Sequence, residues 1–174
     1  MKREIESELA VLVGEAFWSP RRAGNLLLLE FGPQKRFKNH RGEWVTGGRF
    51  ALHVSCPWRI SNRRGMLVGA EDVYLPPSDM RKTPRGWQWG AGPTRFTEQV
   101  LRWLPARSEP IAVVQSIRAD RFGGFHLSMS GSVGLDVFPC CTADYDLLSE
   151  EWRFFAARSR ERHFVVSFRT AGRV

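Results

Sequence analysis

The last third of the chain consists of short strand-like segments joined by short turns, and this arrangement restricts the fold most. Strands are expected at 111–119, 124–129, 133–138, 151–156 and 163–168. Glycine-containing turns stand at 121–124 and 130–132, and an acidic loop at 140–149 joins the third strand to the fourth. Antiparallel strands need only short turns, whereas parallel strands need crossovers of a dozen or more residues. We therefore expect residues 111–168 to form a C-terminal antiparallel β-meander.

Two further strands are expected in the first half of the chain. Residues 26–31 begin with four consecutive leucines, a run typical of a strand that is buried on both faces. Farther along, Phe50, Leu52 and Val54 alternate with smaller or polar residues, which is the period of a half-buried strand. Pro57 has no backbone N–H to donate, so it is expected at a bulge or a sheet edge.

Turn residues predict two connections in this half. Residues 58–60 and 66–68 are expected to pair as a hairpin, because Asn and Gly stand at the two ends of the turn 62–65. Residues 32–48 form a basic connection that contains glycine, with a possible hairpin loop at 39–42.

Two helices are predicted. Their apolar faces are formed by Ile5, Leu9 and Leu12 in the first helix and by Phe96, Val100, Leu101 and Leu104 in the second. Gly14 stands where a C-cap glycine would end the first helix. Thr94 is the expected N-cap of the second helix, and Pro105 is expected to stop it.

The length of 174 residues fits one domain that can bury a core without disulfides or metals. The expected fold is a single α+β domain over residues 1–174. It consists mostly of an antiparallel β-sheet of about 7–8 strands, curved or sandwich-like, with two helices packed on it.

Composition indicates a globular protein. Hydrophobic residues make up 43% and charged residues 25% of the chain, which is the balance of a packed domain. No apolar run approaches the roughly 20 residues of a membrane helix, and no export signal is visible at the N-terminus. The three cysteines, two of them adjacent, do not predict a disulfide framework. A cytoplasmic location with no membrane contact is expected.

The formal net charge of +8 is concentrated in one part of the chain. Residues 31–65 contain eight Lys or Arg residues and one Glu, whereas Phe122–Glu151 contains five acidic residues and no Lys or Arg. A strongly basic segment is typical of nucleic-acid contact. Arg outnumbers Lys by 22 to 4, a bias that a GC-rich genome also produces, so both explanations of the charge stay open.

Two candidate binding sites follow from the basic residues. The first is the Pro- and Gly-rich loop 70–93, where basic residues alternate with two tryptophans: Arg81, Lys82, Arg85, Trp87 and Trp89. Trp and Arg dominate protein-binding hot spots, although both tryptophans could instead dock the loop on the sheet. The second is a positive surface for nucleic acid formed by Lys35, Arg36, Lys38, Arg41, Arg63 and Arg64.

Catalytic and metal-binding signatures are weak. No Gly-x-Ser-x-Gly, phosphate-binding glycine loop or His-Glu-x-x-His stands in the chain. His53 and Cys56 could pair as base and nucleophile, but positions three apart in a strand point to opposite faces. The acidic stretch 136–151 could bind Ca²⁺ or Mg²⁺, although a solvated loop, or a loop facing the basic segment, explains it as well. No catalytic residue, metal ligand or cofactor is predicted.

Several motifs together resemble a group of small uncharacterised bacterial proteins. These are "ALHVSCPWRIS" at 51–61, "VYLPPSD" at 73–79, "FGGFHLSMSG" at 122–131, "LDVFP" at 135–139, "EEWRFF" at 150–155 and "RHFVV" at 162–166. The resemblance covers about residues 10 to 168 and implies no known activity. In size and style such proteins are similar to immunity-type and conflict-system accessory proteins, which is an analogy of class.

The sequence thus predicts a non-catalytic binding protein. The first expectation is a macromolecular protein partner, as for an immunity-type or conflict-system accessory protein. The alternative is a nucleic-acid-binding accessory protein that uses the basic segment and the Arg/Trp loop.

Overall fold

The computed structural model describes residues 1–38, 41–79, 85–103, 109–140, 150–157, 159, 161–167 and 170–174. The helices are α1 (Lys2–Leu9) and α2 (Arg95–Trp103), with short 3-10 turns η1 (Ala10–Leu12), η2 (Ala70–Val73) and η3 (Ser130–Ser132). The strands of the first half are β1 (Ala16–Phe17), β2 (Arg21–Ala23), β3 (Leu26–Phe31), β4 (Lys35–Lys38), β5 (Trp44–Gly47), β6 (Phe50–Val54), β7 (Trp58–Asn62) and β8 (Gly65–Gly69). Those of the second half are β9 (Ala112–Ala119), β10 (Phe125–Met129), β11 (Gly134–Val137), β12 (Glu150–Ala156), β13 (Phe164–Ser167) and β14 (Thr170–Arg173).

Almost all of these strands join one antiparallel sheet. Eleven strands follow the order β14-β13-β12-β6-β3-β1-β9-β10-β11-β7-β8, and β2 joins the sheet as a twelfth by pairing with β3, while β4 and β5 form a separate two-stranded sheet. The predicted α+β class with an antiparallel sheet and two helices is confirmed. The predicted count of seven or eight strands is wrong, because β1, β2, β4, β5 and β14 have two to four residues each and are too short to show an alternating pattern.

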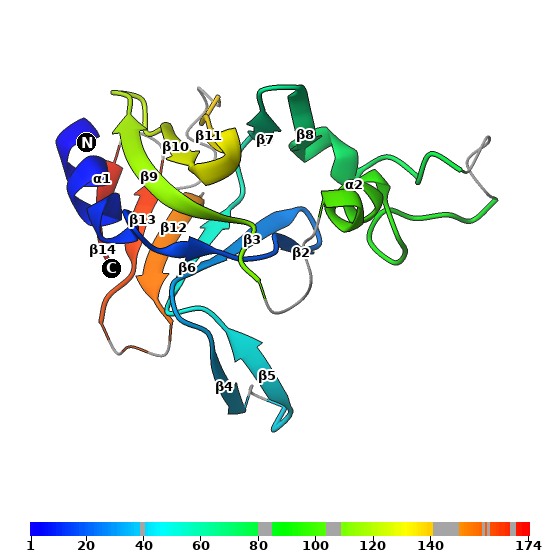
Figure 1. Ribbon diagram of the computed structural model, residues 1–174, viewed down its shortest axis with the longest axis horizontal. Helices are drawn as coiled ribbons and strands as arrows, with labels where there is room; N and C mark the ends of the chain where they lie inside the picture. Colours follow the sequence, from blue (N-terminus) through cyan, green and yellow to red (C-terminus); the bar gives the residue numbers. More distant parts are fainter. Residues whose placement is uncertain are drawn as a thin grey trace.

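The sheet is rolled around a single core, with α1 at one side and α2 at the other (Figure 1). Trp152 of β12 lies edge-on against Phe125 of β10, with ring centroids 4.9 Å apart, although these strands are far from each other in the strand order. The rolled sheet therefore buries the inner faces of its two halves against each other.

The prediction of a C-terminal meander is only partly correct. Strands β9, β10 and β11 pair in sequence order as expected, but β11 then pairs with β7, and β12 pairs with β6 and β13. The chain changes from one half of the sheet to the other between β6 and β7, where Ser55 and Cys56 donate backbone hydrogen bonds to the Glu151 carbonyl. Pro57 lies at this crossing, so it separates two strands and does not interrupt one.

Strand β3 is not buried on both faces, as its leucine run had predicted. Its side chains alternate between buried and half-buried, so Leu27 and Leu29 enter the core while Leu26 and Leu28 face outward. The leucine run thus belongs to a strand buried on one face, because β3 lies in a sheet that has a single core. In β6, Phe50, Leu52 and Val54 are buried as predicted, but Ala51 is buried as well and His53 is half-buried, so the strand is more deeply buried than its alternation predicted.

The two helices agree in most respects with those predicted from the sequence. Ile5, Leu9 and Leu12 are fully buried, and Gly14 has a φ of +88°, the left-handed conformation expected after a helix. In α2, Phe96 and Val100 are buried as predicted, but Leu101 is 66% exposed, so its assignment to the apolar face is wrong. Leu101 directly follows Val100 and turns away from the core, while Leu104 and Pro105 lie outside the described residues. No helix in the described part of the chain is long and apolar enough to span a membrane.

Candidate nucleic-acid interface

The β4–β5 hairpin stands apart from the main sheet. In Figure 1 it extends below the rolled sheet, and its two strands pair only with each other. The register places Arg36 opposite Thr46, Phe37 opposite Val45, and Lys38 opposite Trp44. The sequence anticipated only a basic connection with a hairpin loop here.

The hairpin has two chemically different faces. Side chains alternate along a strand, and directly paired residues share a face. Phe37 and Val45 therefore lie on one face, where both are half-buried. Arg36, Lys38 and Trp44 lie on the other face and are exposed to solvent. The outward face of the hairpin is thus basic and aromatic.

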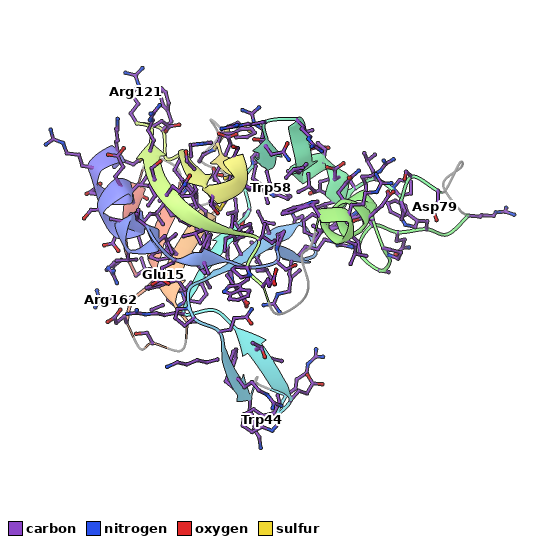
Figure 2. All side chains as sticks on the ribbon, viewed as in Figure 1. Glu15, Trp44, Trp58, Asp79, Arg121 and Arg162 are labelled. Atoms are coloured by element: carbon purple, nitrogen blue, oxygen red, sulfur yellow. The ribbon has the colours of Figure 1, made fainter. Side chains whose placement is uncertain are left out.

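Trp44 is the centre of this outward face. Its side chain is 61% exposed, and Figure 2 places it at the far end of the hairpin. The Arg36 guanidinium carbon lies 5.4 Å from the ring centroid of Trp44, and the Lys38 ammonium nitrogen lies 5.5 Å from it. Cations at this distance are attracted to the negative face of an indole ring. Two positive charges are therefore held beside an exposed aromatic ring.

The base of the hairpin is fixed on β3. A methyl group at Gly48 would lie 2.6 Å from the Phe31 carbonyl oxygen, so only glycine permits this approach of the two backbones. The Gly48 N–H also donates a hydrogen bond of 3.4 Å to a carboxylate oxygen of Glu30, which forms an ion pair with Arg21. The hairpin therefore leaves the sheet at a defined position.

The other basic residues do not extend this surface. Arg63 and Arg64 lie in the turn between β7 and β8, which Figure 1 places at the opposite end of the molecule from the hairpin. The backbone N–H of Arg64 bonds to the side-chain oxygen of Asn62 at 2.8 Å, which confirms the predicted turn. Arg41 lies in the hairpin turn and is exposed. The continuous positive surface expected from sequence is thus divided into two parts.

The tryptophans of the 70–93 loop make contacts within the protein. Trp89 stands edge-on to Tyr74 with ring centroids 5.0 Å apart, and the Arg22 guanidinium bonds to the Trp89 carbonyl at 3.0 Å. The Trp87 indole N–H donates to the Pro93 carbonyl at 3.2 Å. Trp89 remains 38% exposed. Both indole rings therefore contact their own loop, and the link to the sheet is made by Arg22 of β2 to the loop backbone, not by the tryptophans as the docking alternative expected.

The remaining members of this loop site are placed only in part. Arg85 is exposed, whereas Arg81 and Lys82 lie outside the described residues. Partner binding by this loop stays a prediction.

His53 and Cys56 do not form a nucleophilic pair. Burial, and next to it the Glu151 carboxylate, raises the pKa of the Cys56 thiol, so the reactive thiolate is disfavoured. Burial and the nearby Arg153 charge lower the pKa of His53, which packs edge-on against Phe155 at 4.9 Å. Both side chains have structural roles.

The acidic stretch is partly neutralised within the fold. Asp136 accepts a hydrogen bond of 2.9 Å from Arg59, and Glu150 forms an ion pair with Arg153. Asp144 and Asp146 lie outside the described residues. Among the residues that are described, no three metal-ligating side chains gather. The Asp136–Arg59 pair is one contact between the acidic stretch and the basic segment, whereas Glu150 pairs with Arg153 outside that segment.

No protein-family model matches this chain, and no match was found among curated proteins or among solved structures. The resemblance to the bacterial group therefore stays a prediction. Trp44 is the residue that sequence reasoning missed. It follows Lys35, Arg36 and Lys38 by only a few positions, so its signal was a tryptophan within a basic, hairpin-forming segment.

Proposed function

We propose that this protein is a non-catalytic nucleic-acid-binding protein and that the outward face of the β4–β5 hairpin contacts the ligand. The observation that carries this function is Trp44, an exposed ring with Arg36 and Lys38 held beside it. Of the two functions considered from sequence, this is the one that the described side-chain contacts support best.

The chemistry of the face matches single-stranded nucleic acid. Unpaired bases stack on exposed aromatic rings, and each stacked base contributes about 1–3 kcal/mol whatever its sequence. Phosphates next to the stacked base are neutralised by Lys and Arg side chains. A narrow ribbon that presents one ring between cations can engage both parts of a nucleotide at once. A base inside a duplex has no free face for this ring, so single strands are the expected ligand.

The protein-partner function has less support from the described contacts. Trp87 and Trp89, its proposed anchors, already bond or stack within their own loop. Trp44 also contacts side chains of its own hairpin, Arg36 and Lys38, but its side chain is 61% exposed on the solvent face, against 38% for Trp89.

The test is the affinity of the protein for a fluorescently labelled single-stranded oligonucleotide, measured by anisotropy. We expect Trp44→Leu to weaken binding about fivefold or more, since it removes one stacking surface. Leu101→Ala is the control, because Leu101 is equally exposed on α2 and should leave the affinity unchanged. Equal affinities of wild type and Trp44→Leu, or no binding by the wild type, would reject the function.

A further inference from the structure

A row of charged side chains crosses the outer face of the other half of the sheet. Cross-strand pairing aligns Arg118 of β9 with His126 of β10, His126 with Asp136 of β11, and Asp136 with Arg59 of β7. Neighbours along three of the strands, Ile60, Leu127 and Leu135, are fully buried, so the row faces away from the core. Four strands thus bring a guanidinium, an imidazole, a carboxylate and a second guanidinium side by side.

The middle of this row is held by hydrogen bonds. His126 Nδ1 lies 2.7 Å from Asp136 Oδ1 and donates to it, since a carboxylate can only accept. Arg59 Nε donates to Asp136 Oδ2 at 2.9 Å. A methyl group at Gly134 would lie 2.9 Å from His126 Cε1, so this glycine lets the imidazole lie across β11. The imidazole is therefore fixed in orientation by its partner and by the missing side chain.

Two groups of the row remain available. Within the described ranges, neither His126 Nε2 nor the Arg118 guanidinium has a hydrogen-bond or ion-pair partner. Arg118 is exposed, and His126 is half-exposed. Because Nδ1–H donates to Asp136, Nε2 is an acceptor in the neutral imidazole and a donor in the imidazolium. Arg59, by contrast, is already engaged with Asp136. The available groups are thus two positions in direct cross-strand register.

A pocket of about 410 Å³ opens between these side chains. Its walls include Arg59, Arg118, Asp120, His126, Asp136 and Phe138. The Asp120 Oδ1 atom accepts the backbone N–H groups of the turn at 2.7 and 3.0 Å, and Phe138 is 41% exposed with Arg59 above its ring. Ligand sites for small molecules begin at about 300 Å³, so the pocket has room for more than a single inorganic ion.

The arrangement of charges around the pocket leaves Arg118 available for an anion. Its walls carry Arg59 and Arg118 against Asp120 and Asp136, and Arg121 follows Asp120 next to the pocket. Both carboxylates are engaged in hydrogen bonds. Guanidinium groups match the geometry of phosphate oxygens better than any other cationic side chain.

We propose that this pocket binds the phosphate monoester group of a nucleotide-sized organic molecule. Arg118 donates to the phosphate oxygens. His126 does so as an imidazolium, which donates from Nδ1 to Asp136 and from Nε2 to the phosphate. Phe138 covers the organic part. The site is separate from the hairpin, because Figure 2 places Arg121, next to the pocket, at the end of the molecule opposite Trp44. It can therefore stand or fail independently of the proposed function.

Isothermal titration with adenosine 5′-monophosphate as the probe tests this site. We expect the wild type to bind the nucleotide and Arg118→Gln to weaken binding about tenfold, as the loss of one charge-assisted contact does. His126→Gln should weaken it as well. Arg63→Gln, a charge-matched exposed variant outside the pocket, and Trp44→Leu should each stay within about twofold of the wild type.

Adenosine and inorganic phosphate serve as two further probes, one for the organic part of the ligand and one for its phosphate. Adenosine without phosphate should not bind, and inorganic phosphate should bind more weakly than the nucleotide. The proposed site would be overturned if the nucleotide did not bind, if Arg118→Gln kept the wild-type affinity, or if adenosine bound as tightly as its monophosphate. Inorganic phosphate binding as tightly as the nucleotide would overturn the role of Phe138.

Discussion

Trp152 of β12 connects the two halves of the rolled sheet through its contact with Phe125 of β10. Its side chain is fully buried, and its ring packs against Phe125 at 4.9 Å and Phe164 at 5.8 Å. The indole N–H donates a hydrogen bond of 2.7 Å to the buried carbonyl of Gly123. A buried tryptophan contributes both a large apolar area and a satisfied polar group.

Trp152→Phe should lower the free energy of unfolding by about 2–4 kcal/mol. The variant leaves the Gly123 carbonyl without its partner, which costs about 1–3 kcal/mol, and it leaves a small cavity beside the ring. Urea unfolding monitored by circular dichroism measures the change. Trp44→Phe is the matched control and should unfold like the wild type, because Trp44 is exposed. Equal stability of both variants would mean that Trp152 does not join the halves.

At the scale of elements, the hairpin depends on how closely its base approaches β3. Gly48→Ala places a methyl group 2.6 Å from the Phe31 carbonyl oxygen, a contact that real Cβ atoms do not make. We expect a loss of about 1–3 kcal/mol in stability, as for other overpacked positions. Gly90→Ala is the control, because its methyl group would meet no atom within 4 Å. Thermal unfolding compares the two, and an equal effect would contradict the close packing.

Helices and strands with a clear hydrophobic period could be predicted from the sequence, and the shortest strands could not. Phe50, Leu52 and Val54 showed their strand by alternation alone, and Ile5 and Leu9 showed their helix. The pairing of β12 with β6 could not be read from sequence, because it depends on where the chain crosses between halves. The leucine run of β3 misled for the same reason, since the half-burial of its outer face is a property of the rolled sheet.

At the scale of the whole molecule, stability should fall in acid. Burial raises the pKa of Asp136, but the hydrogen bonds from Arg59 and His126 outweigh it and leave the pKa below its usual value. The folded state therefore binds this proton less readily than the unfolded chain does. The contribution is present above the unfolded pKa of about 4 and is lost as the pH falls through the lowered folded value.

The corresponding variant is Asp136→Asn, which cannot titrate. We expect its unfolding midpoint at neutral pH to be lower than that of the wild type and its further loss between neutral pH and about pH 3 to be smaller. Asp120→Asn is a carboxylate control on the same face. An acid-induced loss as large in Asp136→Asn as in the wild type would show that Asp136 is not coupled to folding.

The sequence located the basic segment but not its division in space. Lys35, Arg36 and Lys38 project on the hairpin, whereas Arg63 and Arg64 lie at the far end of the molecule, because β6 and β7 belong to different halves of the sheet. Residue spacing along the chain carries no information about such a crossing. The candidate ligand face was therefore predictable in charge, but its aromatic centre and its limits were not.

The salt dependence of single-strand binding tests the central claim most directly. The logarithm of the affinity falls linearly with the logarithm of the salt concentration, by about 0.7 for each phosphate contact with a single strand. If the hairpin is the contact surface, Arg36→Gln/Lys38→Gln should reduce this slope by about 1.4. The charge-matched variant Arg63→Gln/Arg64→Gln should keep the wild-type slope. The claim that the hairpin binds single strands would be contradicted by an unchanged slope in the hairpin variant. An equal reduction of the slope in both double variants would contradict it as well.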